Sequence, residues 1–247
     1  MIDPSFRALV AQLDRVPGYE PGGQRFKSSP VHLIRNMILY KFPFGPLETN
    51  AILLGCAKTK KAIVIDPAFQ STIPLLHYAS ESGLTIEKIL LTHSHWDHFA
   101  DAFALKQKIS VPLFVHSLDA QNLERPGSDK IPLFFPIHPV TPDAFVKDGD
   151  IISVGEISFR VIHTPGHSPG SVCYYSEENQ LLISGDSLFQ GSIGNLSLPT
   201  AEPKLMWISL RKLEKLPKQT RVIPGHGEDT TIGEESWLPR AEEIFSK

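Results

Sequence analysis

A run of imidazole and carboxylate side chains, placed directly after a strand-like stretch, is the feature that most constrains this chain. Residues 88–91, Lys-Ile-Leu-Leu, have the composition of a strand and lead into residues 92–98, Thr-His-Ser-His-Trp-Asp-His. Alternate side chains of an extended chain point to the same side, so His93 and His95 face one common point. This spacing at a strand end predicts a metal site.

The two residues that end this run are aimed differently. Asp97 and His98 lie where Phe99, Ala102 and Leu105 begin an apolar spacing typical of a helix. A turn at that point directs the two side chains toward a second place near the first, so one loop serves two metals. Imidazole and carboxylate ligands suit zinc, and also iron or manganese, so the ligand types leave the element open.

Three further segments each place one metal-binding side chain in a turn after a strand-like run. His167 lies in Pro-Gly-His-Ser, Asp186 in Ser-Gly-Asp-Ser and His226 in Pro-Gly-His-Gly. A single histidine before a strand end is usually a surface residue or a packed core residue. Seven such residues in order favour a complete two-metal site instead.

These segments resemble the metallo-β-lactamase superfamily, and within it a short form of the glyoxalase II branch. The first motif of that branch is Thr-His-x-His-x-Asp-His and commonly contains His-Trp-Asp-His, as residues 92–98 do. The resemblance extends over residues 37–247. It implies a single domain of the α/β class, the metallo-β-lactamase αβ/βα four-layer sandwich, with the metals at one edge between two sheets.

The resemblance also implies a role for each ligand. It divides the seven residues into three groups: His93, His95 and His167 for the first metal, Asp97, His98 and His226 for the second, and Asp186 as the bridge between them. We expect Asp97 and Asp186 to be the catalytic residues. Asp66, at the end of the strand-like run 62–65, is expected to orient the ligand loop by hydrogen bonds. The alternative for Asp66 is an ordinary turn at a strand end.

Strand-like runs alternate with helical spacing through most of residues 37–247. The expected strands cover residues 38–40, 50–54, 62–65, 88–91, 112–115, 157–162, 171–175, 181–184 and 220–223. Apolar stripes predict helices within residues 73–79, 102–109 and 205–213, the last through Leu205, Ile208, Leu210 and Leu213. This alternation fits two sheets with helices on their outer faces.

The remaining histidines lie outside the ligand motifs. Four of them are expected to be ordinary surface residues: His32, His77, His116 and His138. His163 ends the strand-like run 157–162 and precedes His167 by four positions. We expect His163 to pack near the site rather than to bind metal.

The composition is that of an ordinary globular domain, with 41% hydrophobic and 21% charged residues among 247. The net charge of −3 and the lack of a lysine or arginine cluster argue against a nucleic-acid surface. The sequence contains no run of about 18 apolar residues, so no membrane span is predicted. Cys56 and Cys173 lie in strand-like stretches, so we expect two buried thiols in a cytoplasmic protein.

Residues 1–36 resemble the peptide obtained when a transfer-RNA gene is translated by mistake. Residues 17–21 back-translate plausibly into a loop between matching stems, and residues 25–28 into a TψC-like sequence. We therefore expect a non-native or disordered extension before a protein that starts at Met37. The alternative is a genuine flexible arm, and the genomic DNA upstream of the Met37 codon distinguishes the two.

Residues 124–145 contain five prolines around Leu133-Phe134-Phe135 and resist regular structure. Two interpretations stay open for this segment. It is either a stiff loop that presents aromatic rings beside the metals, or a surface connection packed by its own apolar residues.

The ligand set predicts hydrolysis by an activated water. Ser94 lies between two ligands without a Gly-x-Ser-x-Gly turn, which argues against a serine nucleophile. Two metals about 3.5–4 Å apart can bridge a water and lower its pKa from about 15.7 toward about 7, which supplies hydroxide at neutral pH. The same ions stabilise the oxyanion that forms at a carbonyl. The resemblance suggests a small-molecule thioester such as S-lactoylglutathione.

The resemblance is weaker where the substrate would bind. Glyoxalase II relatives usually have a Gly-Arg pair after the bridging aspartate, whereas Asn195 takes the place of the arginine here. They also bind glutathione with basic residues of a helical C-terminal extension, whereas residues 237–245 form one closing helix at most in this chain. A different thioester is therefore as compatible with the sequence as S-lactoylglutathione.

Two other classes of protein share the motif. A persulfide dioxygenase of the same fold would use a single iron held by the first three histidines and Asp186, and would consume oxygen. A catalytically silent metal-binding or interaction protein is expected to have lost a ligand, and none of the seven is missing. Metal stoichiometry separates the hydrolase from the dioxygenase.

Overall fold

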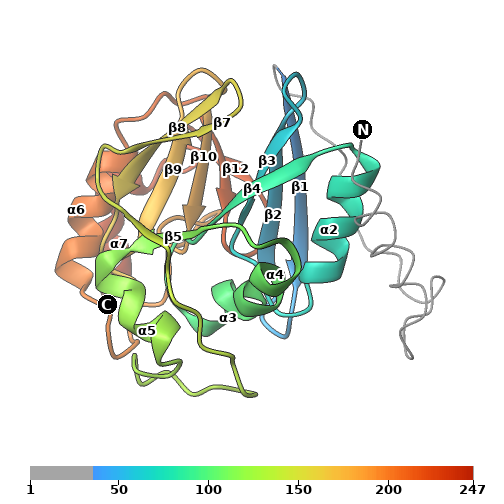
Figure 1. Cartoon of the computed structure of the whole chain (residues 1–247). Helices are drawn as coiled ribbons and strands as arrows, with labels where there is room; N and C mark the ends of the chain where they lie inside the picture. Colours follow the sequence, from blue (N-terminus) through green and yellow to red (C-terminus); the bar gives the residue numbers. More distant parts are fainter. Residues whose placement is uncertain (1–35, 247) are drawn as a thin grey trace.

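The computed structural model describes residues 36–246, which form two β-sheets that face each other with helices on their outer sides (Figure 1). Residues 1–35, on which the start-site prediction depends, lie outside the described part of the chain. The layers are helix, sheet, sheet and helix. This arrangement confirms the predicted four-layer α/β sandwich.

The first sheet has six strands in the order β1-β2-β3-β4-β5-β6. Their bounds are β1 Met37–Phe44, β2 Thr49–Cys56, β3 Lys61–Ile65, β4 Thr85–Leu90, β5 Leu113–His116 and β6 Ala144–Val146. β1 to β3 are antiparallel neighbours, whereas β3 to β6 run parallel. The carboxyl ends of β3, β4 and β5 therefore meet at one edge, where residues 92–98 begin.

The second sheet has the order β12-β11-β10-β9-β8-β7. Its strands are β7 Ile151–Val154, β8 Ile157–His163, β9 Val172–Ser176, β10 Leu181–Gly185, β11 Arg221–Pro224 and β12 Thr230–Thr231. β8 and β10 are both antiparallel to β9, and β11 is parallel to β10. The carboxyl ends of β8, β10 and β11 thus lie at the same edge, and each is followed by one predicted ligand.

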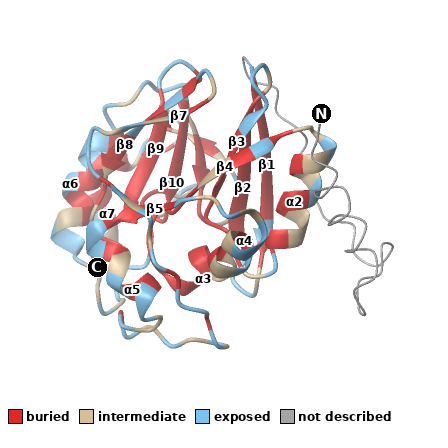
Figure 2. Cartoon of the chain, in the orientation of Figure 1, coloured by how far each residue is buried: buried red, intermediate tan, exposed pale blue. Residues whose placement is uncertain are grey.

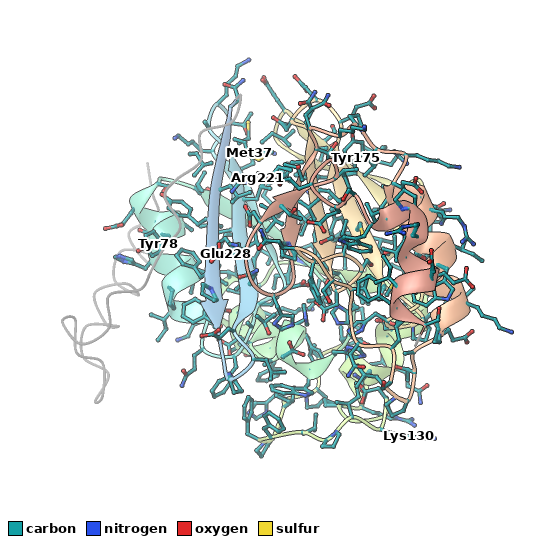
Figure 3. All side chains as sticks on the ribbon, turned by 180° about the vertical axis from the view of Figure 1, so that it is seen from behind. Met37, Tyr78, Lys130, Tyr175, Arg221 and Glu228 are labelled. Carbon is teal, nitrogen blue, oxygen red and sulfur yellow. The ribbon has the colours of Figure 1, made fainter. Side chains whose placement is uncertain are left out.

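Helices cover the outer face of each sheet. The helices are α2 Thr72–Glu81, α3 Trp96–Phe99, α4 Ala102–Ile109, α5 Ala120–Glu124, α6 Pro203–Leu213 and α7 Ala241–Phe245, with 3-10 turns η1 Ser117–Asp119 and η2 Leu238–Arg240. Of these, α2 and α4 pack on the first sheet and α6 and α7 on the second. Tyr78 of α2 packs on β1, with its ring centroid 5.0 Å from that of Tyr40 and 4.8 Å from that of Phe42 (Figure 3). None of the helices within residues 36–246 is long and apolar enough to cross a membrane.

The inner strands, such as β2, β9 and β10, are buried on both faces, as Figure 2 shows by their red colour against the paler outer sides of the helices, whereas β7 and β8 expose part of one face. Along β1, Met37 and Leu39 face the core between the sheets, whereas Ile38 and Tyr40 face the helices. This alternation follows from the two-residue period of a strand. Burial on both faces explains the near-continuous apolar runs that marked the strands in the sequence.

A tyrosine hydrogen bond connects the two sheets near the edge where the predicted ligands lie. Tyr174 of β9 is fully buried between the sheets, and its hydroxyl donates a hydrogen bond of 2.8 Å to the carbonyl of Leu91, directly after β4. Burial raises the pKa of this hydroxyl well above its usual value, so it remains a donor. The residue before the first motif is therefore fixed relative to the second sheet.

Every predicted strand is present, although the ends differ by a few residues. The prediction missed β6, β7 and β12, which are two to four residues long. Short edge strands leave little periodic signal, and β7 even exposes Ile151. The prediction that Cys56 and Cys173 are buried thiols is confirmed.

The predicted apolar stripe of α6 was partly wrong. Ile208 is 48% exposed, whereas the buried apolar residues are Met206, Trp207, Leu210 and Leu213. Met206, Leu210 and Leu213 follow the helical spacing with Trp207 beside them. Ile208 lies outside that stripe, because the face is set by packing on the second sheet rather than by local composition.

Candidate metal centre

All seven predicted ligands lie together at the shared edge of the two sheets. Their donor atoms fall into three overlapping groups in which each atom lies within 4.8 Å of the others: His93, His95 and His167; His93, His98 and Asp186; Asp97, His98 and His226. The residues come from both sheets, so only the folded chain assembles them. All seven lie within residues 36–246.

The first group contains only histidines. His93 Nε2 lies 3.1 Å from His95 Nδ1, and the ring centroids of His95 and His167 are 4.4 Å apart. All three residues are buried. The alternating geometry of an extended segment after β4 brings His93 and His95 to the same side, as the sequence predicted.

The second group is mixed and more open. His98 Nε2 lies 3.3 Å from His226 Nε2 and 3.4 Å from Asp97 Oδ2, and His226 Nε2 lies 3.3 Å from the same carboxylate oxygen. Asp97 and His98 lie on α3, a single turn that starts directly after His95. That turn explains why the second pair of residues points to a different place from the first pair.

Asp186 lies between the two groups. Its Oδ2 is 3.3 Å from His167 Nε2 in the first group, and its Oδ1 is 3.4 Å from His98 Nε2 in the second. His226 Nε2 is 3.6 Å from Oδ2. This is the position expected of a shared ligand.

The imidazoles are oriented by acceptors on their far sides. His98 Nδ1 lies 2.9 Å from Asp66 Oδ2, His167 Nδ1 lies 3.1 Å from the carbonyl oxygen of Asn195, and His226 Nδ1 lies 2.8 Å from that of Leu47. A carbonyl oxygen can only accept, so Nδ1 of the last two rings carries the proton. In the neutral form of each ring, the lone pair of Nε2 is then directed at the site.

The seven side chains fit a pair of divalent ions. Ligands about 2.0–2.2 Å from a tetrahedral ion lie about 3.3–3.6 Å from one another, and most of the separations between neighbouring donor atoms here have that size. His167 Nε2 and Asp186 Oδ1 are buried without a well-aligned hydrogen bond to any protein group. Buried polar atoms without partners are costly, and a cation between them removes that cost.

Burial controls the charge of the first group. Desolvation, together with the neighbouring imidazoles His98 and His95, holds the pKa of His93 well below its usual value. Desolvation and His167 lower the pKa of His95 to about 3. Both rings are therefore neutral at pH 7, which is the form that binds a metal.

The carboxylates dominate the second group. Burial alone would raise the pKa of Asp97, but His98 and His226 lower it to about 2. Burial would also raise the pKa of Asp186, but the surrounding histidines, above all His98, hold it well below its usual value. Hydrogen bonds from His226 to Asp186 and Asp97 outweigh burial and raise the pKa of His226 to about 10. This half of the site attracts positive charge.

The structure confirms that Asp66 orients the ligand loop. Its Oδ1 accepts a hydrogen bond of 2.7 Å from Thr92 N, and its Oδ2 accepts one of 2.7 Å from Thr92 Oγ1 besides facing His98. Asp66 has a φ of +50°, which is uncommon for a residue other than glycine. Strain of this kind persists where the surroundings hold the residue in place.

Two residues of β2 support the second group, which the sequence did not predict. Thr49 Oγ1 donates a 2.6 Å hydrogen bond to Asp97 Oδ2. Asn50 Nδ2 donates to the carbonyls of Pro224 at 2.9 Å and Gly227 at 3.0 Å, on either side of His226. Residues 49–50 carry no local signal for this role, because both contacts join segments far apart in sequence.

Two glycines allow the ligands to approach each other. A Cβ at Gly225 would lie 2.1 Å from Asp186 Oδ1, and a Cβ at Gly194 would lie 2.7 Å from His167 Nδ1. Real Cβ contacts are never that short. The glycine before His226 is therefore required by packing at the centre itself.

The other histidines follow the predictions with one exception. His77 and His138 are exposed, and His32 lies outside the described residues. His116 is buried, so the prediction of a surface residue was wrong; its ring stacks on that of His163 at 4.2 Å between centroids. His163 packs as predicted, and its Nε2 lies 3.0 Å from the carbonyl of Pro169.

The proline-rich loop packs next to the first motif. The ring of Trp96 lies 5.2 Å from that of Phe134 and 5.4 Å from that of Phe135, and Phe135 lies 4.1 Å from Phe69. Phe134 is 64% exposed, whereas Trp96 is buried. The loop thus packs on Trp96 and Phe69, which lie outside it, and presents the ring of Phe134 to solvent.

The match to a family model agrees with this fold and site. Residues 44–226 match the Metallo-beta-lactamase superfamily. The match covers most of the chain, and the chain therefore belongs to the metallo-β-lactamase superfamily, a group of metal-binding hydrolases.

Three individual proteins of known sequence or structure are similar to this chain. The chain is 32% identical to the hydroxyacylglutathione hydrolase GloC of Haemophilus influenzae over 185 residues, which cover 71% of this chain and 84% of that protein. It is 38% identical to the solved structure of BLEG-1, described as a B3 metallo-β-lactamase, with a TM-score of 0.74 and coverage of 80% and 95%. TTHA1623 in a di-iron-bound form is 37% identical, with a TM-score of 0.66 and coverage of 79% and 96%. The predicted resemblance to glyoxalase II-like members is confirmed.

Proposed function

We propose that this protein is a binuclear metallohydrolase that cleaves thioesters. The observation that supports two ions most directly is the position of Asp186, whose two oxygens lie 3.3 Å from His167 Nε2 and 3.4 Å from His98 Nε2. A carboxylate between two complete groups of donors is suited to join two ions.

We assign the donors to the two ions as the resemblance implies. His93, His95 and His167 would hold one ion, Asp97, His98 and His226 the other, and Asp186 both. Zinc is our first choice, and the ligand types also suit iron or manganese, as the di-iron form of TTHA1623 illustrates. When bound, two such ions would lower the pKa of a bound water toward about 7 and would stabilise the oxyanion formed at a carbonyl.

The chain itself orients the donors of the second group. Thr49 donates to Asp97 Oδ2, and Asp66 faces His98 Nδ1, so each of the two predicted ligands on α3 contacts a side chain that orients it. The side chain of His226 is 26% exposed, whereas those of Asp97 and Asp186 are 9% and 10% exposed. Substrate therefore approaches the centre from the side of His226.

A thioester is the substrate class supported by the similarity to GloC. Asn195 stands where glyoxalase II relatives usually have arginine. Its side-chain oxygen accepts a hydrogen bond of 2.8 Å from Ser197 N, and its carbonyl faces His167. This residue offers no positive charge for a carboxylate of glutathione, so we propose a small thioester without strict glutathione specificity.

A β-lactam amide is the second candidate substrate. The similarity to BLEG-1, which is the most extensive of the structural matches described above, favours it. The same hydroxide and oxyanion chemistry cleaves an amide in a strained ring. We also propose a cytoplasmic location, because Cys56 and Cys173 are buried free thiols.

The test combines metal content with turnover on the whole chain. We expect about two metals per chain and hydrolysis of S-lactoylglutathione that is lost in Asp186→Ala. Two metals without thioester turnover, but with nitrocefin cleavage, would replace the thioester by the β-lactam. One iron per chain, no hydrolysis, and oxygen uptake with glutathione persulfide would replace the hydrolase by the persulfide dioxygenase.

A further inference from the structure

A buried carboxylate outside the seven donors connects two of the ligand loops. Asp119, the last residue of η1, is 3% exposed. Its Oδ2 accepts hydrogen bonds of 2.8 Å from Ser94 N and 2.8 Å from Ser168 Oγ, and its Oδ1 accepts one of 2.6 Å from Gly170 N. Neither the motifs nor the proposed chemistry assigns Asp119 a role.

The three donors come from the loops that hold the histidine-rich group. Ser94 lies between His93 and His95, in the loop that follows the first sheet's β4, whereas Ser168 directly follows His167, in the turn between β8 and β9 of the second sheet. Asp119 thus contacts segments from both sheets. The carboxylate sets the separation between the two loops at the point where their imidazoles meet.

The surroundings of Asp119 are built for this contact. A Cβ at Gly170 would lie 2.5 Å from Asp119 Oδ1, so only glycine lets the backbone N–H come so close. The carbonyl of Ser94 is held as well, by Asn122 Nδ2 at 2.5 Å. Asn122 is fixed in turn by Asp129 Oδ2 at 2.7 Å. Both backbone polar groups of Ser94 are therefore held by residues 119–122.

Keeping this carboxylate buried is costly. Desolvation raises its pKa, and the hydrogen bonds from Ser168, Ser94 and Gly170 act in the opposite direction. Hydrogen bonds to an ionised carboxylate are stronger and shorter than neutral ones. A buried charge satisfied only by two ligand loops stabilises one arrangement of those loops.

We propose that Asp119 is a positioning residue for the histidine-rich half of the metal centre. It holds the loop of His93 and His95 against the loop of His167 and so sets the affinity of this half for its ion. Asp66 has the corresponding role for the other half, through His98. The inference rests on the proposed metal ligands, but it does not depend on which substrate is cleaved.

The test is titration of Co²⁺ into the metal-free full-length protein, followed by absorbance. Two binding events are expected for the wild type. His167→Ala and His226→Ala serve as references, because each removes a ligand from one half only and so gives the spectrum of the other half. In Asp119→Asn one event should weaken by about 10–100-fold, the usual effect of losing a partner that orients a ligand. The remaining spectrum should match that of His167→Ala.

Glu235→Gln is the matched control. Glu235 is also a buried carboxylate with three donors, namely Thr230 Oγ1, Gly191 N at 2.8 Å and Trp237 Nε1 at 2.5 Å. It contacts neither the loop of residues 93–98 nor that of residues 167–171. Glu235→Gln should lower the thermal midpoint of the metal-free protein about as much as Asp119→Asn does, while both Co²⁺ affinities stay as in the wild type.

Several results would overturn the inference. Unchanged binding of both ions in Asp119→Asn would do so, and so would equal weakening of both events or a spectrum like that of His226→Ala. If Asp119→Asn does not fold, Ser168→Ala decides, since it removes one donor and should weaken the same event by a smaller factor. A wild type that binds two ions but cleaves no thioester would refute the proposed substrate and leave this inference standing.

Discussion

The two halves of the metal centre are built differently. His93, His95 and His167 are buried and enclosed by loops of both sheets, and the lowered pKa values of His93 and His95 keep those two rings neutral. In the other half, Asp97 adds negative charge, and the side chain of His226 is 26% exposed. One half is thus a closed imidazole site and the other an open, acidic one.

This difference separates two requirements of a hydrolytic centre. A buried group of imidazoles is suited to hold an ion but leaves little surface for a substrate to approach. An exposed group with a carboxylate admits substrate but depends more on support from behind, which here comes from Asp66, Thr49 and the carbonyl of Leu47. Asp186 lies between the two halves and contacts a histidine of each.

Removing the shared carboxylate should have the largest effect. Asp186→Ala deletes the donor that lies next to both halves, so hydrolysis should fall by about a thousandfold or more, because several kcal/mol of transition-state stabilisation depend on the ions. Steady-state kinetics and metal analysis measure this. Asp148→Ala, a carboxylate that contacts His163 N instead, is the control. Retention of both ions and of most activity would contradict the role of Asp186 as the ligand shared by the two halves.

Adding a methyl group at Gly225 should have the next largest effect. The Cβ of Gly225→Ala would lie 2.1 Å from Asp186 Oδ1 and 2.7 Å from His98 Cε1, so the carboxylate must move. Overpacking of this kind costs about 1–3 kcal/mol of stability, which a thermal melt would detect, and activity should fall with it. Gly83→Ala is a control without overpacking, since nothing lies within 4 Å of a Cβ there; its φ of +63° adds backbone strain far from the centre, so it should lower stability but keep metal content and activity. Normal metal content and activity in Gly225→Ala would contradict the packing.

Asp66→Asn should weaken metal binding in the open half more than in the closed half. Asparagine tolerates a positive φ, so the backbone is kept while the acceptor for His98 Nδ1 is weakened. The affinity of the open half should fall by about 10–100-fold, as measured by Co²⁺ titration. The closed half should change less, because it is reached only through Thr92. A larger loss in the closed half would reverse the assignment of Asp66.

Thr49→Val should give the smallest effect. Valine keeps the shape of threonine but removes the hydroxyl that donates to Asp97 Oδ2. A hydrogen bond to a charged group contributes about 1.5–3 kcal/mol, and part of this should appear as a fall of up to about tenfold in affinity of the open half. Thr49→Ser keeps the donor and should behave as the wild type. A change in the closed half instead would show that Thr49 acts on the fold as a whole.

The sequence was informative where function depends on residues that are close together in the chain. Residues 92–98 contain four donors in seven positions, and the strand before them fixes their directions. The turns around His167, Asp186 and His226 were equally clear because each combines glycine with a donor after an apolar strand. The structure brings all seven together, as expected.

The parts that escaped prediction depend on contacts between distant segments. Thr49 supports Asp97 across 48 positions, and Gly170 meets Asp119 across 51. The carbonyl groups of Leu47 and Asn195 orient two rings, yet a backbone acceptor leaves no trace in side-chain identity. His116 was misplaced for the same reason, since its burial comes from stacking on a residue of the other sheet.

A crystal structure of the zinc-loaded protein with anomalous scattering tests the central claim most directly. We predict two anomalous peaks. One should lie within coordination distance of His93, His95 and His167, the other should lie within coordination distance of Asp97, His98 and His226, and Asp186 should lie next to both. A single peak in the histidine group, with His226 and Asp97 turned away from any ion, would contradict this prediction.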